Sequence, residues 1–208
     1  MTASASSEPT RSIEVERKYD ADDETPLPDW SQLPEVSRVG DPEVRELDAR
    51  YYDTERLDLA RARVAVRRRE GGPDAGWHVK ASAAAGRSEW GWPLDHGDGS
   101  SVPSVIADAV AEWAAPPFAP LARIRNTRTA YALEDPAGRL VAEFVDDRVR
   151  GFDERAGRHT AWREWEVELG PAAPADSDAF FAAVDAAVSA AGGRPAASDS
   201  KLGRVLGH

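Results

Sequence analysis

Glu14, Glu16 and Lys18 are spaced two residues apart between Ile13 and Tyr19, near the N-terminus. Successive side chains of a β-strand point to opposite faces, so this spacing puts two carboxylates and an ammonium on one ionic face. Such a face is typical of the solvated side of an edge strand, because antiparallel sheets commonly leave one side in water. It also suits a charged interior that binds a charged ligand, and the rest of the chain decides between the two.

Ionic faces recur on later segments that have the period of two expected of strands. The opposite faces carry tryptophans and valines, which helices could cover. If the ionic faces turn inward, the interior holds charges that are costly unless they are paired. An anion bound together with divalent cations would satisfy both signs of charge. The residues on these recurring faces are Arg67, Arg69, Arg87, Glu89, Glu164, Glu166 and Glu168.

Lysine is rare in this chain: of 26 basic residues, only Lys18, Lys80 and Lys201 are lysines. A composition so rich in arginine and alanine indicates biased codon supply, so each lysine marks a position where arginine does not serve. A compact ammonium with three donors differs from a planar guanidinium where phosphate oxygens converge in a tight site. The alternative is that each lysine survives by chance.

The composition predicts one globular domain, since the 208 residues are 41% hydrophobic and 30% charged. A net charge of −11 argues against a protein that coats nucleic acid, which needs a basic surface. The chain has no cysteine and no apolar run of membrane-spanning length. We therefore expect a cytoplasmic protein with a disordered leader over residues 1–10 and a single domain over residues 11–208.

The elements that would position these residues are mostly strands, joined by links of hairpin length. The pattern predicts an α+β fold with a largely antiparallel sheet, and eight strands suffice to close a barrel around a small ligand. We thus expect an eight-stranded antiparallel closed β-barrel, or tunnel, with flanking helices. The expected strands are 12–19, 44–52, 63–70, 77–81, 87–94, 121–133, 139–150 and 160–169, and the expected helices are 102–113 and 176–191.

The Glu14-x-Glu16-x-Lys18 motif resembles the N-terminal signature of the CYTH family, the triphosphate tunnel metalloenzymes. This family includes thiamine triphosphatases, inorganic triphosphatases and class IV adenylyl cyclases. Further residues follow in the family's order and approximate spacing over essentially the whole chain, and all three lysines fall on family positions. The matching positions after the motif include Asp53, Arg67, Arg69, Lys80, Arg87, Arg128, Asp146, Asp147, Glu166, Glu168 and Lys201.

The resemblance implies a tunnel that binds triphosphate on one wall and Mg²⁺ or Mn²⁺ on the other, and hard oxygen ligands suit either metal. The implied partner is a small-molecule triphosphate, with no nucleic acid or membrane, bound by a monomer or homodimer. The expected metal ligands are Glu14, Glu16, Asp146, Asp147, Glu166 and Glu168. The expected phosphate-binding residues are Lys18, Arg67, Arg69, Lys80, Arg87, Arg125, Arg128 and Lys201. Glu16, Lys18 and Lys80 are the expected catalytic residues.

Three functions fit this pattern. The first is hydrolysis of a short triphosphate, most simply inorganic triphosphate, by a metal-associated water that attacks a terminal phosphorus. The second is cyclisation of ATP to cyclic AMP, and the third is non-catalytic binding of triphosphate or polyphosphate. Two acidic pairs favour catalysis, because a pure anion binder gains nothing from so many carboxylates. Phosphoryl transfer needs mainly positioning and neutralised charge.

Some assignments stay open at the level of sequence. The alternation of side chains along the strand does not show whether Asp146 or Asp147 binds the metal, since both faces of that strand carry a charge. Glu164 competes with Glu166 and Glu168 for two metal-binding roles. The tryptophans indicate packing under helices more than a base-stacking platform. Tyr52 fits either the core or a substrate contact. The four histidines show no metal-site spacing, and we expect them on surfaces or loops.

Overall fold

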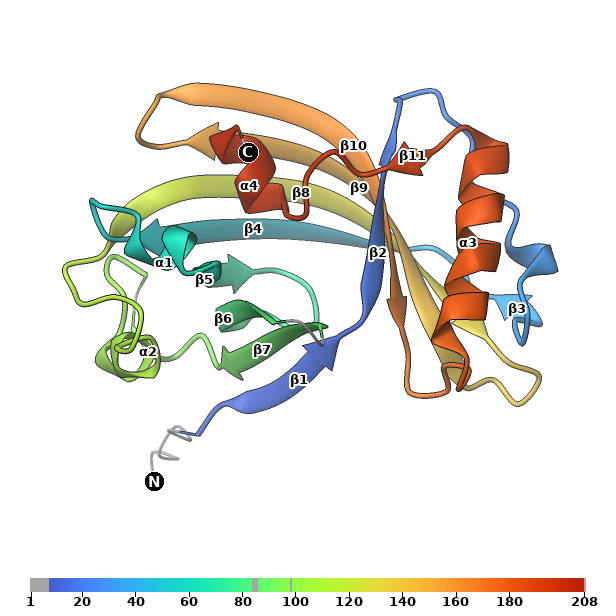
Figure 1. Ribbon diagram of the computed structural model, residues 1–208, viewed down its shortest axis with the longest axis horizontal. Helices are drawn as coiled ribbons and strands as arrows, with labels where there is room; N and C mark the ends of the chain where they lie inside the picture. Colours follow the sequence, from blue (N-terminus) through green and yellow to red (C-terminus); the bar gives the residue numbers. More distant parts are fainter. Residues whose placement is uncertain (1–7, 84–85, 98, 208) are drawn as a thin grey trace.

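The computed structural model describes residues 8–83, 86–97 and 99–207; the side chains of residues 82, 83, 86 and 87 are also outside the description. Its described part is one large antiparallel sheet with short helices around it (Figure 1). The strands are β1 (Thr10–Glu14), β2 (Glu16–Ala21), β3 (Arg38–Val39), β4 (Glu43–Asp53), β5 (Val64–Glu70), β6 (Gly76–Ala83), β7 (Gly86–Trp92), β8 (Ala119–Glu134), β9 (Leu140–Asp153), β10 (Arg158–Leu169) and β11 (Arg194–Pro195). The helices are η1 (Trp30–Gln32), α1 (Asp58–Arg61), α2 (Ser104–Ala109), α3 (Ser177–Ala191) and α4 (Lys201–Leu206).

The sheet order is β1-β7-β6-β5-β4-β8-β9-β10-β2-β11, with β3 paired to β8. β1 and β2 are consecutive in the chain yet lie near opposite ends of this order, because β1 pairs with β7 and β2 pairs with β10. Only Val15 separates the two strands, and its carbonyl oxygen accepts a hydrogen bond from the Leu169 N–H at 3.0 Å. The sheet therefore curls round until the chain itself joins its two sides, at a position that we call the seam.

The expectation of a closed eight-stranded barrel is wrong in two respects. The described residues form an eleven-stranded sheet, and no hydrogen-bonded ladder between β1 and β2 closes it. The predicted strand over residues 12–19 is two strands, because its two halves pair with different neighbours. The broader prediction of an antiparallel, β-rich α+β fold is confirmed.

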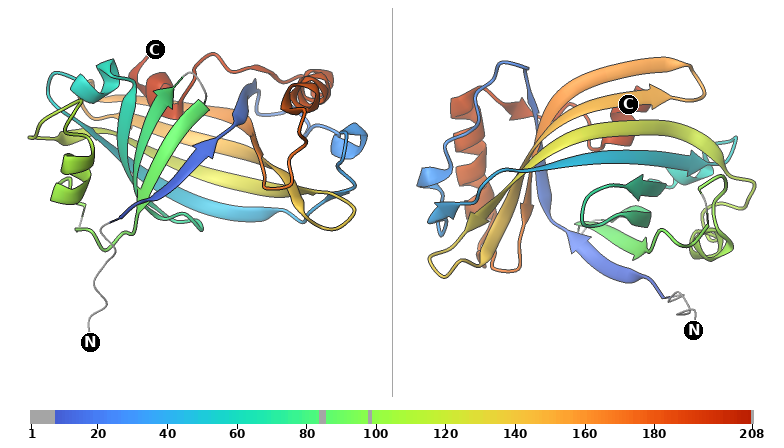
Figure 2. Two further views of the ribbon diagram at one scale, coloured as in Figure 1. Left: turned by 60° about the horizontal axis from the view of Figure 1, so that its bottom comes forward. Right: turned by 180° about the vertical axis from the view of Figure 1, so that it is seen from behind.

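The first of three hydrophobic clusters lies under helix α3, which covers the sheet at one end of the long strands (Figures 1 and 2). Its buried residues Phe180, Phe181, Val184 and Val188 recur at helical spacing, so they share one side. Asp176 caps the N-terminus by accepting from the Ala179 N–H, and Gly192 ends the helix in the left-handed conformation. The core includes the fully buried Trp165 and Phe144.

A second core lies at the other end, between β5, β6, β7 and the helices α1 and α2. Trp77 and Val79 on β6 are almost completely buried there, on the opposite face from His78 and Lys80. Tyr52 belongs to this core, since it is 2% exposed and donates to the Gly99 carbonyl oxygen at 2.7 Å. The tryptophans of both cores thus pack as the sequence indicated.

A third cluster lies against the inner face of the sheet, where α4 covers one end of the lumen. Val205 of α4 is fully buried among Ala49, Ile124 and Val149. In the described part of the chain, no helix is long and apolar enough to cross a membrane.

Candidate functional site

The sheet curls around a cavity of about 610 Å³ that brings together most of the residues singled out in the sequence. They come from β1, β2, β5, β6, β8, β10 and α4, and their side chains share the inner face because each strand alternates. All three lysines of the chain are among them. The predicted residues that line the cavity are Glu14, Glu16, Lys18, Arg67, Arg69, Lys80, Arg128, Glu166, Glu168 and Lys201.

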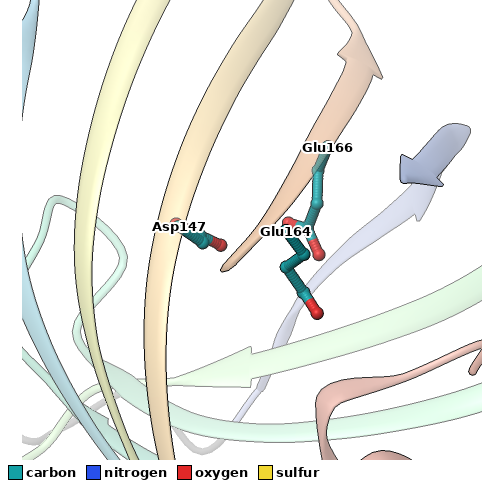
Figure 3. Close-up of side chains that lie close together, drawn as sticks. All are labelled: Asp147, Glu164 and Glu166. Carbon is teal, nitrogen blue, oxygen red and sulfur yellow. The ribbon is translucent and has the colours of Figure 1, made fainter. Parts of the chain in front are cut away.

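Three buried carboxylates meet at the inner wall: Asp147 on β9 and Glu164 and Glu166 on β10 (Figure 3). One oxygen atom from each lies within 4.8 Å of the others. Lys201 reaches all three, with its Nζ 2.9 Å from Asp147 Oδ2, 2.5 Å from Glu164 Oε1 and 2.8 Å from Glu166 Oε1. Ser200 caps α4 and so fixes the helix that begins at Lys201.

Arg128 and Lys18 complete the charge balance of this inner cluster. Arg128 donates to both oxygens of Asp147 at 2.9 and 2.7 Å and to Glu166 at 2.8 Å, while Lys18 pairs with Glu166 and Glu16. Although burial opposes ionisation, Lys18, Lys201 and Arg128 hold the pKa of Glu166 well below its usual value. Three carboxylates therefore face three cations.

A second group of carboxylates lies at the seam and is less well balanced. Glu168 and Glu16 are directly opposite each other on β10 and β2, and Glu14 follows on the far side of Val15. Like charges in this arrangement repel. Burial, and then the neighbouring Glu16, raises the pKa of Glu168. Burial, and then a hydrogen bond with Glu89, raises the pKa of Glu14 to about 7. Lys80 pairs with Glu14 and Lys18 pairs with Glu16, so three carboxylates share two cations and the group keeps a surplus of negative charge.

Arg67, Arg69 and Lys80 on β5 and β6 form the complementary basic side of the cavity. Arg67 and Arg69 are 8% and 7% exposed, and the Nε atom of each is buried without a hydrogen-bond partner among the described residues. Burial, and then the nearby Arg67 and Arg128, lowers the pKa of Arg69 to about 9. Unsatisfied donors and crowded positive charge are what an anion with several oxygens would relieve.

Two predicted residues lie elsewhere. Arg125 is on the outer face of β8, where its Nε is 3.4 Å from Asp48, because it is an odd number of residues from Arg128. Asp146 also points away from the lumen and accepts from Arg163 at 2.8 and 3.0 Å. These two positions are corrections to the expected site. Arg87 is opposite Glu14 in the sheet register, and its side chain is outside the described residues.

The structure adds three residues to the expected site, Glu164, Glu89 and His78. Glu164 belongs to the buried cluster, although the pair Glu166 and Glu168 was preferred. Glu89, also on the inner side, is 3.3 Å from Arg67 and 3.1 Å from Lys80. His78 was expected on a surface or loop, yet it is 6% exposed with its Nδ1 2.6 Å from Glu89. The spacing of His78 two residues before Lys80 was the signal that could have found it.

The donor chemistry at the seam fits a divalent cation. Glu14, Glu16 and Glu168 offer hard carboxylate oxygens, and the burial and neighbouring carboxylates that raise the pKa values of Glu14 and Glu168 are what a bound cation would offset. The cluster of Asp147, Glu164 and Glu166 is a further buried acidic group able to hold a metal, although Lys201 already contacts each of its members.

The described strands form an antiparallel sheet that curls around a cavity lined by opposed carboxylates and cations, which defines a class of β-rich α+β proteins with an ionic interior. The family model for the CYTH domain matches residues 12–190, so this chain belongs to the CYTH family. Members of this family are metal-dependent enzymes, triphosphatases or cyclases, that act on small triphosphate substrates.

Two curated relatives, uncharacterized proteins from two strains of Mycobacterium tuberculosis, are each 37% identical to this chain over 214 residues. The match covers 96% of this chain but 41% of each relative, so the chain spans about two fifths of their length.

Two solved structures share the fold, and both are described as putative adenylate or adenylyl cyclases. The protein from Bacillus halodurans has a TM-score of 0.63 and 15% identity, covering 93% of this chain and 97% of that chain. The Hippeastrum protein, described as having a dominant triphosphatase activity, has a TM-score of 0.57 and 17% identity, covering 93% and 95%. At these identities the likeness shows the fold alone.

Proposed function

We propose that this protein hydrolyses a short triphosphate, with inorganic triphosphate as the preferred substrate. The observation that carries the proposal is the division of one cavity into a basic side with unsatisfied guanidinium donors and an acidic seam with surplus negative charge. A triphosphate together with a divalent cation complements both sides at once. Neither ligand alone would do so.

The cavity residues have separate roles in this proposal. Arg67, Arg69 and Lys80 bind phosphate oxygens from one side, and Lys18, Arg128 and Lys201 do so from the other, exchanging carboxylate partners for phosphate. Together they hold the terminal phosphoryl group in place, which is the main requirement of phosphoryl transfer.

Glu14, Glu16 and Glu168 would hold Mg²⁺ or Mn²⁺ at the seam. When bound, the cation neutralises phosphate charge and lowers the pKa of an associated water. Asp147 and Glu166 keep Lys201 and Arg128 oriented toward the cavity.

A second candidate, the cyclisation of ATP, is favoured by one observation. The mouth of the cavity beside α1 and α4 is lined by Ala60, Val64, Leu202 and Leu206, an apolar surface that could accept an organic group. Cyclisation also requires the ribose hydroxyl to be fixed about 3–3.5 Å from the α-phosphorus, a near-attack position. Hydrolysis has no such requirement, since the attacking water needs no organic moiety to orient it.

The deciding experiment compares inorganic triphosphate, thiamine triphosphate and ATP, each with Mg²⁺ and with Mn²⁺. Phosphate release is measured alongside chromatography of the nucleotide products. We expect the highest kcat/KM for inorganic triphosphate, and ADP with phosphate as any products from ATP. Cyclic AMP and pyrophosphate as the main products, with inorganic triphosphate acting only as an inhibitor, would establish the cyclase instead.

A further inference from the structure

His78 has a place beside the cavity that neither the sequence pattern nor the proposed chemistry assigns to it. It lies on the inner face of β6, two residues before Lys80, while Trp77 and Val79 fill the core behind it. Its partner across the ladder is Gly91, where an added Cβ would lie 2.9 Å from Thr10 Oγ1 and 3.9 Å from His78 Nδ1. An added side chain would crowd Thr10 and would touch the imidazole at an ordinary contact distance.

The two ring nitrogens of His78 contact two acceptors on different strands or turns. Nε2 is 3.0 Å from the main-chain carbonyl oxygen of Asp74, in the turn between β5 and β6. Nδ1 is 2.6 Å from Glu89 Oε1 on β7. A neutral imidazole carries one N–H and donates to one acceptor only, so the Nδ1 contact is an ion pair when the ring is protonated. In either form, the buried ring lies between the turn and the Glu89 carboxylate.

Both of these neighbours in turn hold phosphate-binding cations. Glu89 Oε1 is 3.3 Å from Arg67 Nη2, and Glu89 Oε2 is 3.1 Å from Lys80 Nζ. The Asp74 carboxylate pairs with Arg69. His78 thus contacts the two acidic residues that pair with Arg67, Lys80 and Arg69. The ring itself does not reach the positions where these cations would bind phosphate.

We propose that His78 is a positioning residue that fixes Arg67, Lys80 and Arg69, through Glu89 and the Asp74 turn, for binding of the triphosphate chain. The inference rests on the proposed function for its substrate, and it extends that function to a residue behind the ligand-contacting shell. Loss of the ring contacts would let Glu89 rotate toward Arg67 and Lys80 and compete with phosphate oxygens for their hydrogens. The effect would be on substrate affinity more than on the chemical step.

The kinetic test replaces His78 by Phe, which keeps an aromatic ring and removes both polar contacts. We expect His78→Phe to raise KM for inorganic triphosphate about tenfold, equivalent to about 1.4 kcal/mol, with a smaller change in kcat. His78→Gln, which retains hydrogen-bond donors, should recover part of the loss. The matched control is His159→Phe, at an exposed histidine stacked on Phe152, which should leave both constants unchanged.

A double-mutant cycle separates positioning from a general effect on packing. If His78 acts through Glu89, His78→Phe should raise KM much less in a Glu89→Ala background than in the wild-type protein. An unchanged KM in His78→Phe, or an equal effect in both backgrounds, would overturn the proposal.

A spectroscopic test without substrate keeps this inference distinct from the proposed function. In protein labelled with ¹⁵N-histidine, His78 is assigned by its loss in His78→Gln, and its Nδ1 resonance is compared between wild type and Glu89→Gln. A shifted Nδ1 resonance supports the contact even if inorganic triphosphate is not hydrolysed, and it remains measurable if His78→Phe does not fold. The same Nδ1 chemical shift in the wild type and in Glu89→Gln would refute the contact.

Discussion

Lys201 is the residue at which the acidic and basic halves of the cavity are most tightly joined. Its ammonium contacts Asp147, Glu164 and Glu166, and although burial opposes the charge, these carboxylates hold its pKa well above the usual value. Three donors directed to three carboxylates match the geometry of an ammonium, whereas a planar guanidinium would need a wider space. The cavity thus places each kind of cation by the shape of its donors as well as by charge.

Arg128 and Arg125 give a matched pair for testing which face of β8 binds the substrate. Arg128→Ala removes a cavity cation and should lower kcat/KM about thirtyfold, a loss of about 2 kcal/mol in transition-state stabilisation. Arg125→Ala changes an exposed residue of the same strand on the outer face and should leave kcat/KM unchanged. Steady-state kinetics with inorganic triphosphate checks both, and equal losses would mean that substrate binds outside the lumen.

Glu168→Gln tests the metal-binding role of the seam carboxylates. The amide keeps the size and removes the charge, so we expect the apparent metal affinity to fall by about tenfold. Activity should therefore recover in part at higher Mg²⁺ concentration. Glu46→Gln is the control, since Glu46 is exposed on the outer face beside Thr127. A loss of activity that no metal concentration changes would remove Glu168 from the metal site.

Lys80→Arg tests whether the rare lysines are required for their shape. Lys80 Nζ lies 2.7 and 2.8 Å from the two oxygens of Glu14 and 3.1 Å from Glu89, a space filled by a single nitrogen. We expect a loss of about tenfold or more in kcat/KM despite the conserved charge, because a guanidinium cannot occupy the same point. Arg148→Lys, at an exposed residue, is the control, and wild-type activity in Lys80→Arg would support chance survival of that lysine.

At the scale of elements, the sequence alone shows which side chains share a face wherever a strand carries charge on one face only. Glu164, Glu166 and Glu168 share a face on β10 because they are two residues apart, and the structure places all three on one side. On β9 both faces carry charge, so the choice of Asp147 over Asp146 required the structure. The odd spacing between Arg125 and Arg128 already indicated that the two could not share a face.

The fit of α4 against the sheet is an element-scale prediction. A Cβ on Gly151 would lie 2.2 Å from Val205 Cγ2 of α4 and 2.9 Å from Thr160 Oγ1. Gly151→Ala should therefore destabilise the protein by about 1–3 kcal/mol through overpacking and displace the helix that carries Lys201. Urea denaturation measures the first effect and KM for inorganic triphosphate the second. The double variant with Val205→Ala should show less than the sum of the two losses, and additive losses would mean that the two residues do not clash.

At the scale of the whole molecule, the seam is the feature that sequence alone could not reveal. The alternation from Glu14 to Lys18 runs without a break, so nothing in it shows that the ladder partner changes at Val15. Which strands pair is decided by long-range packing of the two cores at opposite ends of the sheet. As a result, Glu14 and Glu16 lie on strands near opposite ends of the strand order, yet both line the same cavity.

The placement of the three lysines makes the outer surface of the folded protein almost free of primary amines. Their side chains are 14%, 19% and 14% exposed for Lys18, Lys80 and Lys201, and all three line the cavity. Formaldehyde with a borohydride methylates primary amines, and a buried amine is less accessible to it. The three lysines should react slowly, and more slowly still with inorganic triphosphate and Mg²⁺ present, as measured by peptide mass spectrometry. Methylation rates that inorganic triphosphate and Mg²⁺ leave unchanged would show that the triphosphate binds elsewhere. Slower methylation of the lysines would make chemical footprinting a direct measure of how much of the cavity is occupied.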